Sequence, residues 1–140
     1  MAKFNQPAQN ARHTVNMCGF PAYSMEDKSK LVTMATTSML AEPKFYGDNS
    51  DKMIELAERT DPAFVSRLAV YVRRELHLRS VAHALCAVVA NRGKAYIRPV
   101  VAGVVERADD ITEILAAYLA LYGKPIPNGL KKALANELTR

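Results

Sequence analysis

The feature that most constrains the fold is a pair of adjacent helix signals in residues 61–94. Asp61 offers a side-chain oxygen that can cap a helix, and Pro62 suits the first helical position. Apolar residues then recur three and four positions apart, which places them on one buried face. A second helix is expected to begin at Ser80 and to end at Gly93. The segment therefore predicts two short amphipathic helices, back to back. The apolar face of the first consists of Val65, Leu68, Ala69 and Val72.

Helical spacing continues over most of the chain after an irregular start. Residues 1–23 show little periodicity and many turn-forming residues, so we expect an extended or turning N-terminal arm. Residues 24–140 are expected to form one helical domain of about seven helices joined by short turns, with no convincing strand pattern. Such a series predicts an all-α fold, either an α-solenoid or a compact bundle.

Three positions in the second half need separate interpretation. Residues 96–107 are rich in valine, which favours strands, but the apolar recurrence at three and four residues favours a helix. Asp109 is expected to cap the following helix, with Arg107 at the end of the preceding one. Asn128 is expected to cap the last helix.

Composition sets the broad class. The 140 residues are 49% hydrophobic and 24% charged, which is ordinary for one globular domain with a sizeable core. No apolar run reaches the roughly 18 residues that a bilayer span needs, and no N-terminal signal pattern is present. We therefore expect a cytoplasmic protein with no membrane contact. The two cysteines, Cys18 and Cys86, are far apart and are expected to be free thiols.

No pattern in the sequence favours a cofactor, a metal or catalysis. His83 and Cys86 have helical spacing, but no second pair of ligands accompanies them. Cys18 and His13 lie on the irregular arm, which would position a nucleophile and its base poorly. The chain also lacks a glycine-rich phosphate-binding motif. We expect a protein without enzymatic activity.

The net charge of +5 is unevenly distributed. Residues 1–60 hold seven basic and seven acidic side chains, whereas residues 61–140 hold twelve basic and seven acidic ones. Such an excess is compatible with a solvated surface that keeps the protein soluble, and equally with a nucleic-acid footprint. Charge alone leaves both interpretations open.

Basic residues with interleaved aromatics define a candidate binding surface. Arg67, Tyr71 and Arg74 fall three to four residues apart, on one face of the first predicted helix. Arginine can contact phosphates, and tyrosine can stack on a base. A similar grouping recurs where Lys94 and Arg98 flank an aromatic residue. The candidate set at this point is Arg67, Tyr71, Arg73, Arg74, Arg79, His83, Lys94 and Arg98.

Each of these residues also has a purely structural interpretation. The arginines of the first helix could form a solvated face with Asp61 and Glu75 nearby. His83 could make a structural hydrogen bond, and Tyr96 could pack against Val100 while the neighbouring charges reach solvent.

Several segments, in their order and spacing, resemble the N-terminal part of the TROVE module, the RNA-binding module of the Ro autoantigen family. The resemblance extends over about residues 15–140. It is carried by Asn16 to Tyr23, Lys44 to Asp48, Asp61-Pro62 with Arg73-Arg74-Glu75, Leu78 to Val81, Arg107 to Ile111, and Gly129 to Leu134.

The resemblance implies a non-catalytic module of HEAT-like helical repeats. Members of the family bind small structured noncoding RNAs on the outside of a ring and single-stranded RNA ends in its central hole. Lys131 and Lys132 lie in the segment similar to the outer RNA-contact helix, and they complete the candidate RNA-binding set.

The chain departs from the family in length, because a full module is several times longer. It also lacks an Asp-x-Ser-x-Ser metal motif; Asp48-Asn49-Ser50-Asp51 does not match it. We expect a fragment, a truncated form or a subunit that self-associates through exposed repeat faces. The alternative to RNA binding is a helical interaction or assembly scaffold with a basic surface.

Overall fold

A computed structural model describes residues 31–33 and 55–138 of the chain, and every regular element in these residues is helical. The all-α class is therefore confirmed for this part of the protein. The expected N-terminal arm and most of the helix expected from Ser24 lie outside the described residues. The main elements are α4 (Pro62–Arg74), α5 (Arg79–Arg92), the 3-10 turn η2 (Lys94–Tyr96), α6 (Ile97–Val104), α7 (Ala108–Tyr122) and α8 (Asn128–Leu138).

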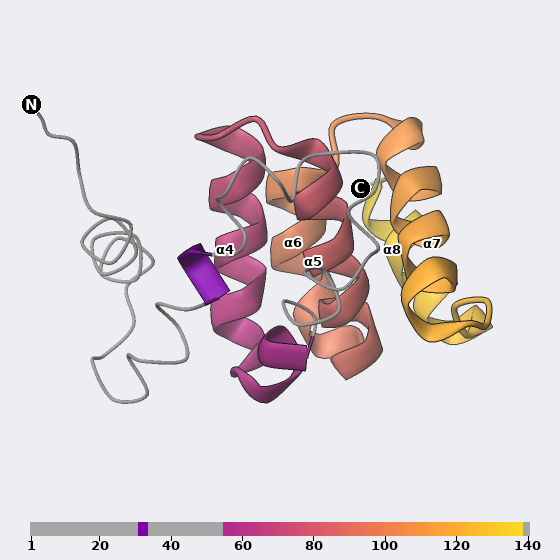
Figure 1. Cartoon of the computed structure of the whole chain (residues 1–140). Helices are drawn as coiled ribbons and strands as arrows, with labels where there is room; N and C mark the ends of the chain where they lie inside the picture. Colours follow the sequence, from indigo (N-terminus) through magenta and orange to yellow (C-terminus); the bar gives the residue numbers. More distant parts are fainter. Residues whose placement is uncertain (1–30, 34–54, 139–140) are drawn as a thin grey trace, which may run out of the picture.

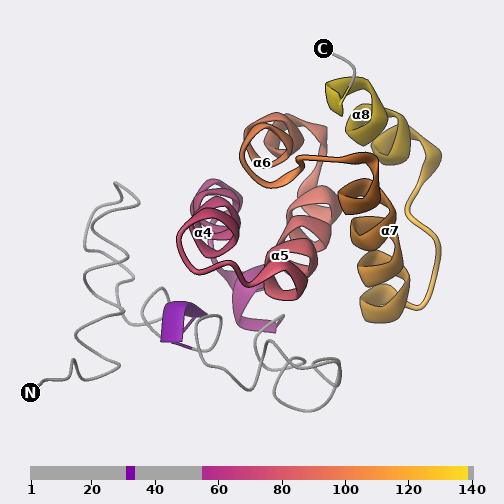
Figure 2. The ribbon, with the colours of Figure 1, turned by 90° about the horizontal axis from the view of Figure 1, so that it is seen from above.

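The helices form two rows, which Figure 2 shows from above. One row consists of α4, α6 and α8, in which each helix packs against the next, and the other consists of α5 and α7. Two hydrogen bonds show that α5 and α7 run parallel. Arg79 at the start of α5 bonds to Asp110 at the start of α7, and Tyr118 near the end of α7 bonds to Asn91 near the end of α5. The N-termini of α5 and α7 therefore lie side by side (Figure 1).

Helix α4 forms as its sequence predicts. The side chain of Asp61 accepts a hydrogen bond from the backbone N–H of Phe64 at 2.9 Å, which satisfies one of the unpaired donors of the first turn. Pro62 occupies the first helical position. The apolar face predicted for this helix is buried in the core, and it contacts both α5 and α6.

Helix α5 differs from the prediction, because it is central rather than amphipathic. Ten consecutive residues, from Val81 to Ala90, are buried. The helix packs against α4, α6 and α7, so small residues such as Ala87 face neighbouring helices instead of solvent. It begins at Arg79, one residue before the expected start at Ser80, and no side chain caps it. Gly93 ends the helix as expected, with a φ of 135° that suits glycine.

Residues 97–104 form helix α6, so the helical interpretation of the valine-rich segment is confirmed for these residues, whereas residues 105–107 of the segment lie beyond the end of the helix. Ile97, Val100, Val101 and Val104 are its buried positions. Gly103 lets α6 approach α4 closely: a Cβ atom at this position would lie 2.5 Å from Cγ2 of Val70. A side chain at position 103 would therefore force the two helices apart.

The N-terminus of α7 corrects a second prediction. Asp110, not Asp109, provides the capping carboxylate: its Oδ2 accepts hydrogen bonds from the backbone N–H groups of Glu106 and Arg107. Arg107 is the N-cap residue rather than the end of the preceding helix, which finishes at Val104. At the other end, Gly123 adopts the left-handed conformation, with a φ of 68°. Within residues 31–33 and 55–138, no helix has the length and apolar character needed to cross a membrane.

Candidate nucleic-acid interface

The outer face of α4 brings together three of the predicted site residues. Arg67, Tyr71 and Arg74 line one hollow of about 500 Å³, which extends to Pro99 of α6. We call this hollow the α4 hollow. Arg67 and Arg74 are exposed, and Tyr71 is half-buried between them. The remaining lining residues are Ser66, Val70 and Glu75.

Arg74 is fixed in place by the end of α6. Its Nε donates to the carbonyl oxygen of Gly103 at 2.9 Å, and a terminal nitrogen lies 3.5 Å from the carbonyl oxygen of Ala102. Carbonyl groups in the last turn of a helix lack intrahelical partners and carry partial negative charge, so a guanidinium is well suited to them. Arg74 thus joins α4 to α6 while its exposed side chain lines the hollow.

Arg73 is separated from this group. Its guanidinium forms an ion pair with Glu106, and its side chain is only 11% exposed. Arg73 therefore links α4 to the connection between α6 and α7. It does not line the α4 hollow, although the sequence places it beside Arg74.

Arg79 and His83 belong to a different, largely buried cluster around Asp110. Oδ1 of Asp110 accepts from Arg79 at 3.2 Å and lies 2.8 Å from Nε2 of His83. The Asp110 side chain has no exposed surface, and that of His83 is 6% exposed. With the two backbone N–H groups of Glu106 and Arg107, four donors surround this carboxylate. The cluster holds the starts of α5 and α7 together.

The protonation states follow from this arrangement. Burial alone would raise the pKa of Asp110, but its hydrogen bonds from Glu106, His83, Arg79 and Arg107 hold that pKa well below its usual range. An ionised carboxylate only accepts hydrogen bonds, so His83 donates from Nε2. Burial lowers the pKa of His83 despite the opposing effect of Asp110. His83 is therefore a neutral structural donor at neutral pH, as its alternative interpretation proposed.

The four remaining candidates are dispersed over η2, α6 and α8. Lys94 is exposed on η2, and its aliphatic chain passes Gly129 of α8. Arg98 pairs with Glu137 at 3.7 Å. Lys131 lines a hollow between α7 and α8, and Lys132 is exposed. The aromatic residue between Lys94 and Arg98 is Tyr96, which packs partly against the core. These residues do not share the α4 hollow.

Sequence reasoning missed Asp110, Glu106 and Gly103 as functional neighbours of the arginines. One signal could have found Asp110. It lies three residues after the N-cap residue Arg107, the spacing at which an acidic side chain can reach back to the backbone of a helix start. The contacts of Glu106 and Gly103 join residues about thirty positions apart, and no local pattern indicates them.

In the part of the chain that the structure describes, no three His, Cys, Asp or Glu side chains are grouped so that they could hold a metal ion. Cys86 is buried as a free thiol, and burial raises its pKa.

Comparison of the chain with models of protein families, with curated proteins and with solved structures finds no match.

Proposed function

We propose that this chain is a non-catalytic RNA-binding module of HEAT-like helical repeats that acts in the cytoplasm. Its RNA is single-stranded or a small structured noncoding RNA. The observation that carries the proposal is the α4 hollow, in which Tyr71 lies between the arginines Arg67 and Arg74. This combination of a ring and two cations suits a base with its flanking phosphates.

The chemistry of the α4 hollow favours single strands. A base can stack on Tyr71 only if it is not paired within a duplex, and such stacking contributes about 1–3 kcal/mol. Val70 and Pro99 add apolar surface beside the ring. Glu75 also lines the hollow and opposes a nearby phosphate, so affinity depends on both arginines.

Two further observations support the proposal. The two rows of alternating helices are the arrangement expected of an α-solenoid, in which each helix pair packs mainly on its neighbours. The order and spacing of the sequence segments resemble those of the TROVE module, whose members bind RNA without catalysing a reaction.

The experiment is a fluorescence-anisotropy titration of labelled single-stranded RNA and of a duplex of equal length, across a salt series. We expect tighter binding of the single strand and an affinity that falls steeply with salt. Arg67→Ala should reduce the slope of log K against log salt by about 0.7, the value for one lost contact to a single strand. Tyr71→Ala should lower affinity with little change in slope, because the ring carries no charge.

The matched control is Lys124→Ala, which removes an exposed positive charge just beyond the end of α7. It lowers the net charge as much as Arg67→Ala does, but Lys124 does not line the α4 hollow. Equal losses in the two variants would show that only net charge matters and would reject the assigned site.

A second candidate function is an assembly scaffold that uses a hollow of about 290 Å³ between α7 and α8. Leu119 is 50% exposed, the one large hydrophobic residue so exposed in the described part of the chain, and it lines this hollow with Leu115 and Pro125. A second copy that covered Leu119 would remove this apolar side chain from water. Sedimentation velocity tests it: a dimer that Leu119→Glu dissociates supports the scaffold, and a monomer at high concentration rejects it.

A further inference from the structure

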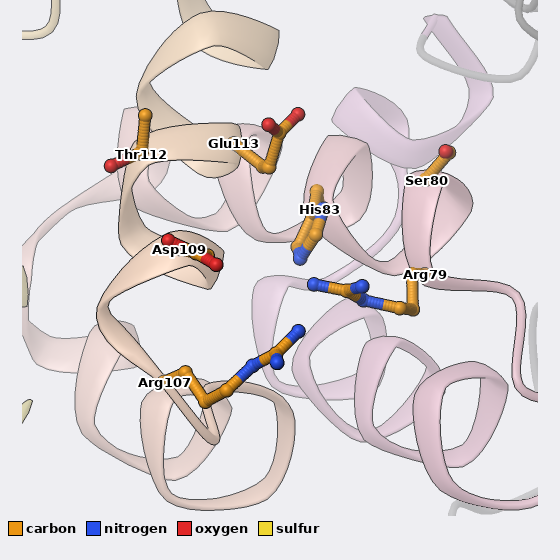
Figure 3. A pocket seen from close by; sticks show the side chains of 7 residues that line it. All are labelled: Arg79, Ser80, His83, Arg107, Asp109, Thr112 and Glu113. Carbon is orange, nitrogen blue, oxygen red and sulfur yellow. The ribbon is translucent and has the colours of Figure 1, made fainter.

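A second hollow, separate from the α4 hollow, lies where α5 and α7 begin. Its volume is about 410 Å³, within the range of small-molecule sites. In Figure 3 the guanidinium groups of Arg79, from α5, and Arg107, from the start of α7, point toward one another across it. The other lining residues are Ser80, His83, Asp109, Thr112 and Glu113.

The two arginines retain capacity for an anion. Arg79 uses one terminal nitrogen on Asp110, and its side chain is 42% exposed, so the guanidinium keeps capacity for a ligand although its Nε is buried. Arg107 is exposed, and no carboxylate of residues 31–33 or 55–138 forms an ion pair with its guanidinium. Asp110 itself is enclosed by its four donors, so it does not pair with the guanidinium of Arg107.

The backbone also favours an anion in this hollow. Because α5 and α7 are parallel and start at the same end, the positive ends of two helix dipoles lie beside the hollow. The hydroxyl groups of Ser80 and Thr112 are further donors on its wall. Two guanidiniums that face one another repel, and a bridging phosphate would relieve that repulsion.

The acidic residues of the hollow restrict the type of anion. Asp109 and Glu113 lie four residues apart on one face of α7 and line the same space as Arg107. They repel a bare anion, but they accept hydrogen bonds from hydroxyl groups. The ligand should therefore join a phosphate to hydroxyl donors. No phenylalanine, tyrosine or tryptophan lines the hollow, and the imidazole of His83 on its wall is almost wholly buried, so stacking on a base contributes little there.

We propose that this second hollow binds a ribose phosphate, with the phosphate between Arg79 and Arg107 and the ribose hydroxyls on Asp109 and Glu113. The ribose phosphate belongs either to a free mononucleotide or to the phosphorylated 5′ end of an RNA. The site shares no lining residue with the α4 hollow, so it stands independently of RNA binding there.

The test is isothermal titration of the full chain with adenosine 5′-monophosphate, adenosine and inorganic phosphate. Adenosine 5′-monophosphate should bind most tightly, because it alone supplies both the phosphate and the hydroxyls. Arg107→Gln should weaken it by about tenfold or more, the effect of losing a charged hydrogen bond. This variant should fold, because the exposed Arg107 side chain is not part of the buried cluster. Lys124→Gln is the charge-matched control and should leave the affinity unchanged.

Two RNAs that differ only in carrying a 5′-phosphate or a 5′-hydroxyl show whether the bound ribose phosphate belongs to an RNA end or to a free nucleotide. Tighter binding of the phosphorylated RNA, with the difference lost in Arg107→Gln, assigns the site to an RNA end. Equal binding of both RNAs, with tight binding of the mononucleotide, assigns it to a free nucleotide. No binding of the mononucleotide, or equal affinity in the wild type and Arg107→Gln, overturns the proposal. Arg67→Ala should weaken RNA but not the mononucleotide, so failure of the α4 hollow and failure of this site are distinguishable.

Discussion

Nε2 of His83 lies 2.8 Å from Oδ1 of Asp110, and both side chains are buried between the starts of α5 and α7. The carboxylate is ionised and the imidazole is neutral, so one hydrogen bond to a charged acceptor joins the two helices. Protonation of His83 would place a second cation beside Arg79, where burial already disfavours charge. This pair therefore makes the fold sensitive to mild acid.

The first prediction concerns that sensitivity. The pKa of His83 is lowered in the folded state from 6.5, mainly by burial, so below about pH 6.5 the unfolded chain binds this proton more readily. Stability should fall as the pH drops from 7.5 to 5. Urea denaturation at several pH values measures the effect. His83→Gln retains a donor for Asp110 but does not titrate, so its stability should change less over this range. Identical pH profiles for the two proteins would contradict the assignment.

A second prediction concerns the charge of Asp110. Asp110→Asn leaves Arg79 and two backbone N–H groups without their ionised acceptor. Breaking a buried pair on one side costs about 3–5 kcal/mol, so the unfolding free energy should fall by roughly 3 kcal/mol. The control, Asp109→Asn, removes the neighbouring exposed carboxylate and should cost under about 1 kcal/mol. Equal losses in urea denaturation would contradict the assignment of the capping carboxylate to Asp110.

The contrast between Asp109 and Asp110 shows which structural features a local sequence pattern can predict. The cap of Asp61, the stop at Gly93 and the helical spacing of residues 97–104 depend on neighbouring residues, and the structure confirms all three. The choice between two adjacent aspartates depends on which of them can reach His83 and Arg79, about thirty residues away. Local spacing carries no information about that contact.

The same distinction applies to the candidate site. The spacing of Arg67, Tyr71 and Arg74 predicted a shared face, and the three residues do line one hollow. Arg73 lies apart from Arg74 because it forms an ion pair with Glu106, which is distant in the sequence. The burial of α5 on all sides likewise follows from the helices packed around it, which its own apolar pattern does not specify.

A third prediction tests the approach of α4 to α6. Gly103→Ala would place a methyl group 2.5 Å from Val70 Cγ2, so one of the helices must shift. We expect a loss of about 1–3 kcal/mol, typical of overpacking. Gly129→Ala is the matched control in α8, where the added atom would meet only the flexible end of Lys94, at 3.7 Å. It should raise stability by about 0.4–1 kcal/mol through helix propensity and the unfolded chain. Thermal unfolding of the two variants should therefore shift in opposite directions.

The last prediction separates the two roles of Arg74, which fixes the end of α6 and lines the α4 hollow. Arg74→Lys keeps the charge but loses the planar group that reaches the carbonyl oxygen of Gly103. The unfolding free energy should fall by about 1 kcal/mol, since the contact is charged but exposed. The salt slope of RNA binding should remain near that of the wild type, because the slope counts charges. Arg74→Ala should lower stability similarly and also reduce the slope by about 0.7. A salt slope that changes equally in both variants would mean that Arg74 affects RNA binding only through the position of α6. Arg67 would then be the one phosphate contact left in the α4 hollow.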